Sequence, residues 1–145
     1  MENPVWVLSG NSLSWGHFMA SFRLVPLIHI VDDDDAVRDS LDAYLTLKGM
    51  QVIAFGSAQD LLDCSEGLPN LVILDVNMPE TDGFTLLEIL RGRGHDMPAI
   101  LMTGLGDPET RARAERAGAA AFFEKPIDPS ILFSTLTRLL SGWRV

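Results

Sequence analysis

The amino-acid sequence predicts a single α/β domain in which five strand–helix units form a three-layer sandwich around a parallel sheet. Short apolar runs recur along the chain, polar or glycine-containing sequence follows each run, and amphipathic segments separate them. The length of 145 residues suits one domain, and 47% hydrophobic with 21% charged residues is typical of a folded globular protein. The expected architecture is therefore (βα)5, without a second domain or an internal repeat.

The expected strands are short and almost wholly apolar. Each run is shorter than a helix normally is, and near-continuous apolar strands are expected where helices cover both faces of a sheet. In chain order, the expected strands are Leu27–Val31, Gln51–Phe55, Leu71–Leu74, Ala99–Met102 and Ala121–Phe123.

Capping residues and glycines bound the expected helices. Asp107-Pro108 and Asp128-Pro129 each place a capping carboxylate before a proline, which is favoured at the first helical position. Glycine follows most of the helical segments and favours their termination. The expected helices are Ala36–Lys48, Ser57 to about Cys64, Thr85–Arg91, Asp107 to Gly118 and Asp128 to Gly142.

Residues 1–26 differ in composition from the rest of the chain, and they lack the basic start and apolar core of a secretory signal. We interpret them as a loosely structured arm, as sequence upstream of a start at Met19, or as an arm whose aromatic side chains pack on the domain or on a second copy. The expected division is an arm over 1–26, a domain over 27–142 and a tail over 143–145. The aromatic residues of the arm are Trp6, Trp15, Phe18 and Phe22.

The charge and cysteine content exclude several classes of function. Asp and Glu outnumber Lys and Arg by 20 to 11, which gives a formal net charge of −9 and argues against a surface for nucleic acid. No apolar run approaches the roughly 18 residues of a membrane-spanning helix, so we expect a cytoplasmic protein without a membrane partner. Cys64 is the only cysteine, which excludes an internal disulfide bond and a cysteine-based zinc site.

Polar side chains follow the expected strands at one edge of the sheet. Asp32 and Asp33 follow the first strand. Asp75 follows the third, Thr103 the fourth and Lys125 the fifth. Ligands bind outside the carboxyl ends of parallel strands, where these side chains meet. Two carboxylates about 4 Å apart repel by about 4 kcal/mol at an effective dielectric constant of 20, so three of them favour a bound cation.

The predicted chemistry of this edge is metal-assisted phosphoryl transfer. Hard oxygen ligands with an open side suit Mg²⁺ or Mn²⁺, and such a metal leaves one oxygen of Asp75 free to attack phosphorus. Lys125 and Thr103 supply the cation and the hydroxyl donor that the charge of a transferred phosphoryl group requires. Each residue alone also fits a plain role, such as a helix cap, a surface lysine or a hydroxyl bonded to its own backbone. The prediction depends on their meeting at one edge.

Four blocks of sequence occur at the expected strand ends: Ile30-Val31-Asp32-Asp33-Asp34, Leu74-Asp75-Val76-Asn77-Met78-Pro79 with Asp82-Gly83, Leu101-Met102-Thr103-Gly104, and Phe123-Glu124-Lys125-Pro126. Each block alone is weakly specific, but their order and spacing are highly specific. Together they resemble the response regulator receiver domain of two-component signalling over about Leu27 to Leu140. Within that family, the stretches Asp35–Arg38, Thr103–Asp107 and Glu124–Pro126 resemble FixJ-type receivers most.

The resemblance implies a flavodoxin-like fold with a parallel sheet of strand order 2-1-3-4-5. It implies that Asp75 accepts a phosphoryl group from a sensor histidine kinase or a histidine phosphotransfer protein. By the same resemblance, Asp33, Asp75 and the backbone carbonyl of Asn77 would hold Mg²⁺, and Asp32 would contribute through water. The chain would then be no enzyme in the ordinary sense, because its only catalysis would be its own phosphorylation and dephosphorylation.

The resemblance also implies a conformational switch. Lys125 would contact the phosphoryl group, and the peptide bond between Lys125 and Pro126 would be cis. Thr103 would move toward the phosphoryl group and Phe122 would follow. This motion would change the face formed by the fourth helix, the fifth strand and the fifth helix, where a downstream protein, an output domain or a second copy of the chain would dock.

Other interpretations remain open at this point. A Mg²⁺-dependent phosphohydrolase of the aspartyl-phosphate type shares the nucleophile, but it carries a second acid where this chain has Asn77, and it needs a substrate pocket. A flavin-binding module would place a phosphate against the run Asp32–Asp35, which would repel it. The chain also fits the receiver part of a longer FixJ-type transcription factor or hybrid kinase. We interpret His29 as a packed core histidine and Cys64 as unreactive.

Overall fold

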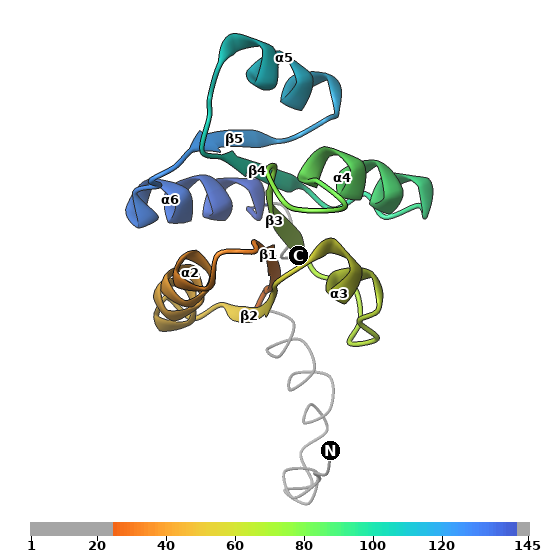
Figure 1. Ribbon diagram of the computed structural model, residues 1–145. Coiled ribbons are helices and arrows are strands. Elements are labelled where there is room, and N and C mark those ends of the chain that lie inside the picture. The colour runs from red at the N-terminus through yellow and green to blue at the C-terminus, as the bar shows by residue number, and fades with distance from the viewer. Residues whose placement is uncertain (1–24, 142–145) are drawn as a thin grey trace, which may run out of the picture.

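The computed structural model describes residues 25–141, so the expected 1–26 arm (apart from its last two residues), Gly142 and the 143–145 tail lie outside the described residues (Figure 1). Five parallel strands form one sheet in the order β2-β1-β3-β4-β5. This order confirms the flavodoxin-like fold. The strands are β1 (Leu27–Val31), β2 (Gln51–Phe55), β3 (Leu71–Asp75), β4 (Ala99–Thr103) and β5 (Ala121–Glu124).

Helices cover both faces of the sheet and make the three-layer sandwich. Figure 1 shows α2 and α6 on one side of the sheet and α3 and α4 on the other. Within residues 25–141, no helix is long and apolar enough to cross a membrane. The helices are α2 (Asp35–Leu47), α3 (Ala58–Leu62), α4 (Gly83–Gly92), α5 (Pro108–Arg116) and α6 (Pro129–Leu139).

The central strands divide their side chains between two apolar cores, because successive residues of a strand point to opposite faces. In β3, Leu71 and Ile73 pack with residues of α2 and α6, whereas Val72 and Leu74 pack with residues of α3, α4 and α5. Every residue of β3 and β4 is buried. A sheet covered on both faces leaves only its edges and strand ends for polar chemistry.

The carboxyl ends of β3, β4 and β5 differ from the sequence-based boundaries by one residue, whereas β1 and β2 end where expected. Asp75, Thr103 and Glu124 each continue a strand that we expected to end one residue earlier. The reason is the ladder itself: Asp75 is in register with Met102, and Thr103 with Glu124. These polar residues are therefore held by sheet hydrogen bonding and do not belong to loose connecting segments.

The helix boundaries also differ from the expected ones by one to three residues, and the expected ends of α5 at Gly118 and of α6 at Gly142 were too late. Helix α4 begins at Gly83, because the Asp82 carboxylate caps it by accepting a hydrogen bond of 2.8 Å from the Thr85 amide. Helix α3 ends at Leu62, so the expectation that it runs to Cys64 was wrong. Cys64 lies in the connection to β3, where its sulfur accepts a hydrogen bond from the Glu66 amide.

Candidate functional site

Four polar side chains meet at the carboxyl edge of the sheet. Asp32 directly follows β1, Asp75 ends β3, Thr103 ends β4 and Lys125 directly follows β5. Asp32, Asp75 and Thr103 are all buried, with 0%, 2% and 1% of their surface exposed. Buried carboxylates are rare unless they are paired or bind a metal, so this edge is the candidate site.

Lys125 is the cation of this edge. Its Nζ lies 2.7 Å from Asp32 Oδ2 and 3.4 Å from Asp75 Oδ1. Burial lowers the pKa of Lys125, but its contacts with Asp32 and Asp75 outweigh burial and raise the pKa above the usual value. The Lys125 amide donates to the Thr103 carbonyl at 2.7 Å, and the Lys125–Pro126 peptide bond is cis. Lys125 therefore stays charged and is held directly over both carboxylates.

Asp75 is easier to protonate than an ordinary aspartate. Burial, and next the neighbouring charge of Asp32, raise the pKa of Asp75 to about 6. The Lys125 ammonium and the Asn77 amide act in the opposite direction and only partly compensate. A further cation at this edge would favour the ionised, nucleophilic form of Asp75.

The carboxylates suit a hard divalent cation. One oxygen from each of Asp32, Asp33 and Asp75 lies within 4.8 Å of the others. Asp32 and Asp75 are buried, whereas Asp33 is exposed, so the cluster opens to solvent on one side. Oxygen donors with an open side fit Mg²⁺, which keeps several waters and binds through one or two carboxylates. The donor set therefore fits the magnesium ion that the sequence predicts.

Asn77 contributes a contact that the sequence did not predict. Its side-chain Nδ2 donates to Thr103 Oγ1 at 3.1 Å, and the Leu105 amide donates to the same hydroxyl oxygen at 3.1 Å. The backbone N–H of Asn77 also donates to Asp75 Oδ1 at 3.4 Å. From the sequence we expected the backbone carbonyl of Asn77 to contact a metal ion. In addition, its side-chain amide connects the β3 and β4 ends and holds the Thr103 hydroxyl.

Gly83 lets helix α4 approach the end of β3. A Cβ atom at Gly83 would lie 2.4 Å from the Asp75 carbonyl oxygen and 3.1 Å from Val76 Cα, both of which are backbone atoms. Only glycine fits here without moving the segment that carries Asp75. The sequence contained the signal, a glycine directly after the capping Asp82, but one chain does not reveal which backbone it meets.

Phe122 does not belong to the carboxylate cluster. It lies on β5 opposite Leu101 of β4 and is half-buried against the core beneath α3, α4 and α5. The guanidinium of Arg111, on α5, lies 5.0 Å from the centre of its ring. Phe122 therefore connects β5 with α5 on the face where we expect the switch.

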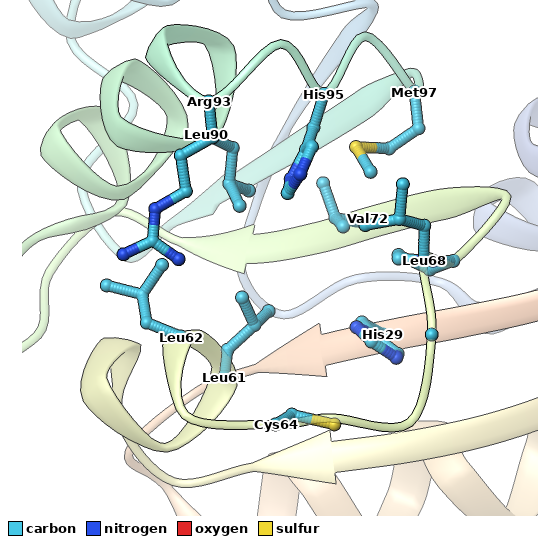
Figure 2. Close-up of a pocket in the computed structure, with 12 residues that line it drawn as sticks. His29, Leu61, Leu62, Cys64, Leu68, Val72, Leu90, Arg93, His95 and Met97 are labelled. Atoms are coloured by element: carbon cyan, nitrogen blue, oxygen red, sulfur yellow. The ribbon is translucent and has the colours of Figure 1, made fainter.

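A second region with buried polar side chains lies between α3 and α4 (Figure 2). A pocket of about 70 Å³, here called the amino-end pocket, opens between α3, α4 and the connections that precede β3 and β4. Its lining includes His29, Leu61, Cys64, Arg93, His95 and Met97.

The two imidazole rings of the amino-end pocket are incompletely hydrogen-bonded. His29 Nε2 and His95 Nδ1 are buried, and neither has a hydrogen-bond partner in the described part of the chain. Burial lowers the pKa of His29 to about 4, so its ring is neutral at physiological pH. The ring packs edge-on against Phe55 with 5.1 Å between centroids. His29 is thus a packed core histidine, as predicted. The amino-end pocket, at about 70 Å³, has room for about two water molecules.

Comparisons with known proteins agree with this geometry. Residues 28–137 match the response regulator receiver domain family. The chain is similar to the transcriptional regulatory protein FixJ of Azorhizobium caulinodans, with 40% identity over 110 residues that cover 75% of this chain and 52% of that protein. It is 35% identical to the transcriptional regulatory protein DctD of Pseudomonas aeruginosa over 128 residues, 87% of this chain and 28% of that protein.

Solved structures give the same result. The crystal structure of FixJ-N is 33% identical with a TM-score of 0.70, and the match covers 80% of this chain and 94% of that one. The receiver domain of a histidine kinase from Syntrophus aciditrophicus is 35% identical with a TM-score of 0.73, over 81% and 92% of the two chains. The chain spans about half the length of the FixJ proteins that it matches. The chain belongs to the response regulator receiver domain family of two-component signalling.

Proposed function

We propose that this domain is a phosphoacceptor switch in which Asp75 receives a phosphoryl group from a phosphohistidine of a sensor histidine kinase or a histidine phosphotransfer protein. The observation that carries the proposal is the position of Asp75 at the end of β3, with Lys125 Nζ 3.4 Å from its Oδ1 and with oxygens of Asp32 and Asp33 within 4.8 Å. These groups supply a nucleophile, a fixed positive charge and a set of metal ligands.

In the proposed reaction, a carboxylate oxygen of Asp75 attacks phosphorus. An oxygen–phosphorus bond forms, the nitrogen–phosphorus bond of the donor breaks, and its electron pair returns to the imidazole of the donor. Lys125 balances charge on the phosphoryl oxygens because its ammonium is already held beside Asp75. Thr103 offers a hydroxyl from the neighbouring strand end, once it leaves its contacts with Asn77 and Leu105.

Asp32, Asp33 and Asp75, with the backbone carbonyl of Asn77, would hold Mg²⁺, and Mn²⁺ offers the same oxygen chemistry. When bound, the metal neutralises charge on the transferred group and on the carboxylates. The chain's own part is to keep Asp32 and Asp75 apart from solvent and oriented by Lys125, so that little rearrangement is needed.

The proposed output is a change of the face formed by α5, β5 and α6, which corresponds to the expected fourth helix, fifth strand and fifth helix. Thr103 would move toward the phosphoryl group and Phe122 would follow, which would disturb the contact between Phe122 and Arg111. A downstream protein, an output domain or a second copy of the chain would read this face. FixJ and DctD are described as transcriptional regulators, which favours an output domain.

The proposed domain division remains 1–26, 27–142 and 143–145, and the proposed location is the cytoplasm. Because the chain spans about half of the FixJ proteins, we propose that it is the receiver part of a transcription factor of that type. A hybrid kinase is the alternative context.

The alternative of a phosphohydrolase requires a second acid at position 77. Asn77 is not an acid, and its side-chain amide donates a hydrogen bond to the Thr103 hydroxyl.

The experiment that tests the proposal is intact mass after incubation with Mg²⁺ and acetyl phosphate. We expect one added phosphoryl group on the wild type and on an Asp96→Ala control, which removes an exposed aspartate elsewhere. The Asp75→Ala variant and the sample without metal should stay unmodified. Absence of the adduct, together with absence of beryllium fluoride binding, would overturn the assignment of Asp75.

A further inference from the structure

Arg38 contacts the segment that carries the metal ligands although it is neither acidic nor at a strand end. It is the fourth residue of α2, and its guanidinium turns back over the connection from β1. Nη1 donates to the backbone carbonyl of Asp32 at 2.7 Å, and Nη2 pairs with the Asp35 carboxylate. Only 21% of the Arg38 side chain is exposed, whereas the Asp35 side chain is 83% exposed.

The guanidinium also occupies a space at the end of β2. A Cβ atom at Gly56 would lie 3.2 Å from Arg38 Nη1 and 3.6 Å from its Cζ, so a side chain there would press on the guanidinium. Arg38 thus joins three segments: the connection after β1, the first turn of α2 and the residue that follows β2.

With the contact from Arg38 to the Asp32 carbonyl, every polar group of Asp32 has a hydrogen-bond partner. The Asp32 amide donates to the Phe55 carbonyl at 3.1 Å. Its Oδ1 accepts from the Asp34 amide at 2.9 Å and its Oδ2 from Lys125 at 2.7 Å. The Asp32 carbonyl belongs to the peptide plane from which Asp33 departs. Holding that oxygen sets the direction in which Asp33 leaves the sheet, and hence whether its carboxylate reaches the cluster.

We propose that Arg38 is a positioning residue for the divalent cation: it fixes the Asp32–Asp33 peptide so that both carboxylates face the metal position. This inference rests on the proposed Mg²⁺ site. Groups that orient metal ligands commonly change metal affinity by 10-fold or more when they are removed. Arg38 acts on the backbone between two ligands and touches no ligand oxygen.

Charge and position make opposite predictions for this residue. Arg38 is a cation beside an acidic cluster, so its charge alone opposes a divalent ion, and removing it would tighten Mg²⁺ binding. Loss of positioning would weaken Mg²⁺ binding instead. The sign of the change therefore separates the two roles.

The test is Mg²⁺ affinity by isothermal titration calorimetry for the wild type, Arg38→Met and Arg93→Met. Arg93 is exposed at the opposite end of the sheet and is the matched control for the lost charge. We expect the Kd of Arg38→Met to rise about tenfold. The Kd of Arg93→Met should stay within about twofold, because salt screens exposed charges beyond roughly 10 Å. A Kd for Arg38→Met equal to or below the wild-type value overturns the inference.

Two milder variants keep the inference testable if Arg38→Met fails to fold. Arg38→Lys keeps the charge, but its ammonium lacks the planar group that contacts both the Asp32 carbonyl and the Asp35 carboxylate. Gly56→Ala keeps Arg38 but adds a methyl group 3.2 Å from its Nη1. We expect an increase in Kd for both, and unchanged affinity in both would overturn the inference. At saturating Mg²⁺ the rate of phosphorylation by acetyl phosphate should return to near the wild-type rate. A wild type that binds no Mg²⁺ would instead refute the proposed metal site.

Discussion

The two ends of the sheet differ in whether their buried polar groups have hydrogen-bond or ion-pair partners. At the carboxyl edge, Asp32 and Asp75 are paired with Lys125, and the Thr103 hydroxyl bonds to Asn77 and Leu105. At the amino-end pocket, buried nitrogens of His29 and His95 have no partner within the described residues. Both regions hold buried polar side chains. Only the carboxyl edge combines fixed charges of both signs with an opening to solvent.

The difference also appears in how the two ends respond to pH. Burial disfavours the charged form of either group, so it raises the pKa of Asp75 to about 6 and lowers that of His29 to about 4. Asp75 lowers the free energy of unfolding as the pH rises from about 4 to 6, because its buried carboxyl ionises less readily in the folded chain than in the unfolded one. His29 lowers the free energy of unfolding as the pH falls, because its imidazole is protonated below about pH 6.5 in the unfolded chain but only below about pH 4 in the folded one. The two effects oppose each other between about pH 4 and 6, so each becomes visible only when the other is removed.

The largest expected effect comes from removing the cation of the carboxyl edge. Lys125→Met leaves the fully buried Asp32 carboxylate without its ammonium partner. Breaking a buried pair in this way costs about 3 kcal/mol of unfolding free energy. The measurement is urea denaturation at pH 7.5 with a chelator present.

Saturating Mg²⁺ should recover part of this loss, because a divalent ion between the carboxylates replaces the missing charge. Arg93→Met serves again as the charge-matched control and should be close to neutral. If Lys125→Met were as stable as the wild type without metal, the contrast between a charged and a neutral end of the sheet would fail.

The second effect concerns the buried nucleophile. Asp75→Asn removes a carboxyl whose pKa is raised to about 6 in the fold. Without metal, the loss of stability caused by ionising Asp75 begins near the ordinary pKa of 3.8, grows as the pH rises, and is nearly complete above about pH 6. We therefore expect Asn to stabilise the domain by about 2 kcal/mol at pH 7.5, less than the full effect of two pKa units because the buried amide also lacks partners.

The check on Asp75→Asn is its unfolding free energy at pH 4.5 and pH 7.5 in a chelating buffer. The gain over the wild type should be much larger at pH 7.5. An equal gain at both pH values would show that the substitution acts through packing, and would remove the charge of Asp75 from the comparison.

The sequence predicted which residues reach the carboxyl edge because parallel topology decides it. Once strand–helix alternation is recognised, Asp32, Asp75, Thr103 and Lys125 must follow strands at the same edge. The position of each residue depends only on which strand it follows. The hydrophobic pattern of a single sequence is enough to locate the strands and hence these residues.

What escaped prediction depends on how connecting segments close on the sheet. The amide of Asn77 reaches Thr103, and Arg38 folds back onto the Asp32 carbonyl, through conformations that no local pattern specifies. The contact at Gly83 needs the path of α4 over the end of β3. That His95 Nδ1 has no hydrogen-bond partner in the described part of the chain likewise becomes apparent only after the amino-end pocket has formed.

The smallest effect at neutral pH is expected at the amino-end pocket. His29→Leu keeps the side-chain volume roughly constant and removes a buried nitrogen that has no partner within residues 25–141. We expect a gain of about 1 kcal/mol at pH 7, because leaving a buried polar group unsatisfied costs about that much. The gain should grow by about 2 kcal/mol on going to pH 5, since the wild type loses stability there when its unfolded chain protonates His29 and the variant does not.

Urea denaturation of His29→Leu between pH 5 and pH 7.5 measures both parts, and His29→Phe tests whether ring shape rather than polarity matters against Phe55. Mg²⁺ affinity and phosphorylation of Asp75 should be unchanged, because His29 lies in the middle of β1 and its side chain lines the amino-end pocket, outside the carboxylate cluster. A loss of stability at neutral pH would mean that the unpaired nitrogen of His29 is satisfied by water in the amino-end pocket. In that case both ends of the sheet would be hydrogen-bonded, and charge alone would distinguish them.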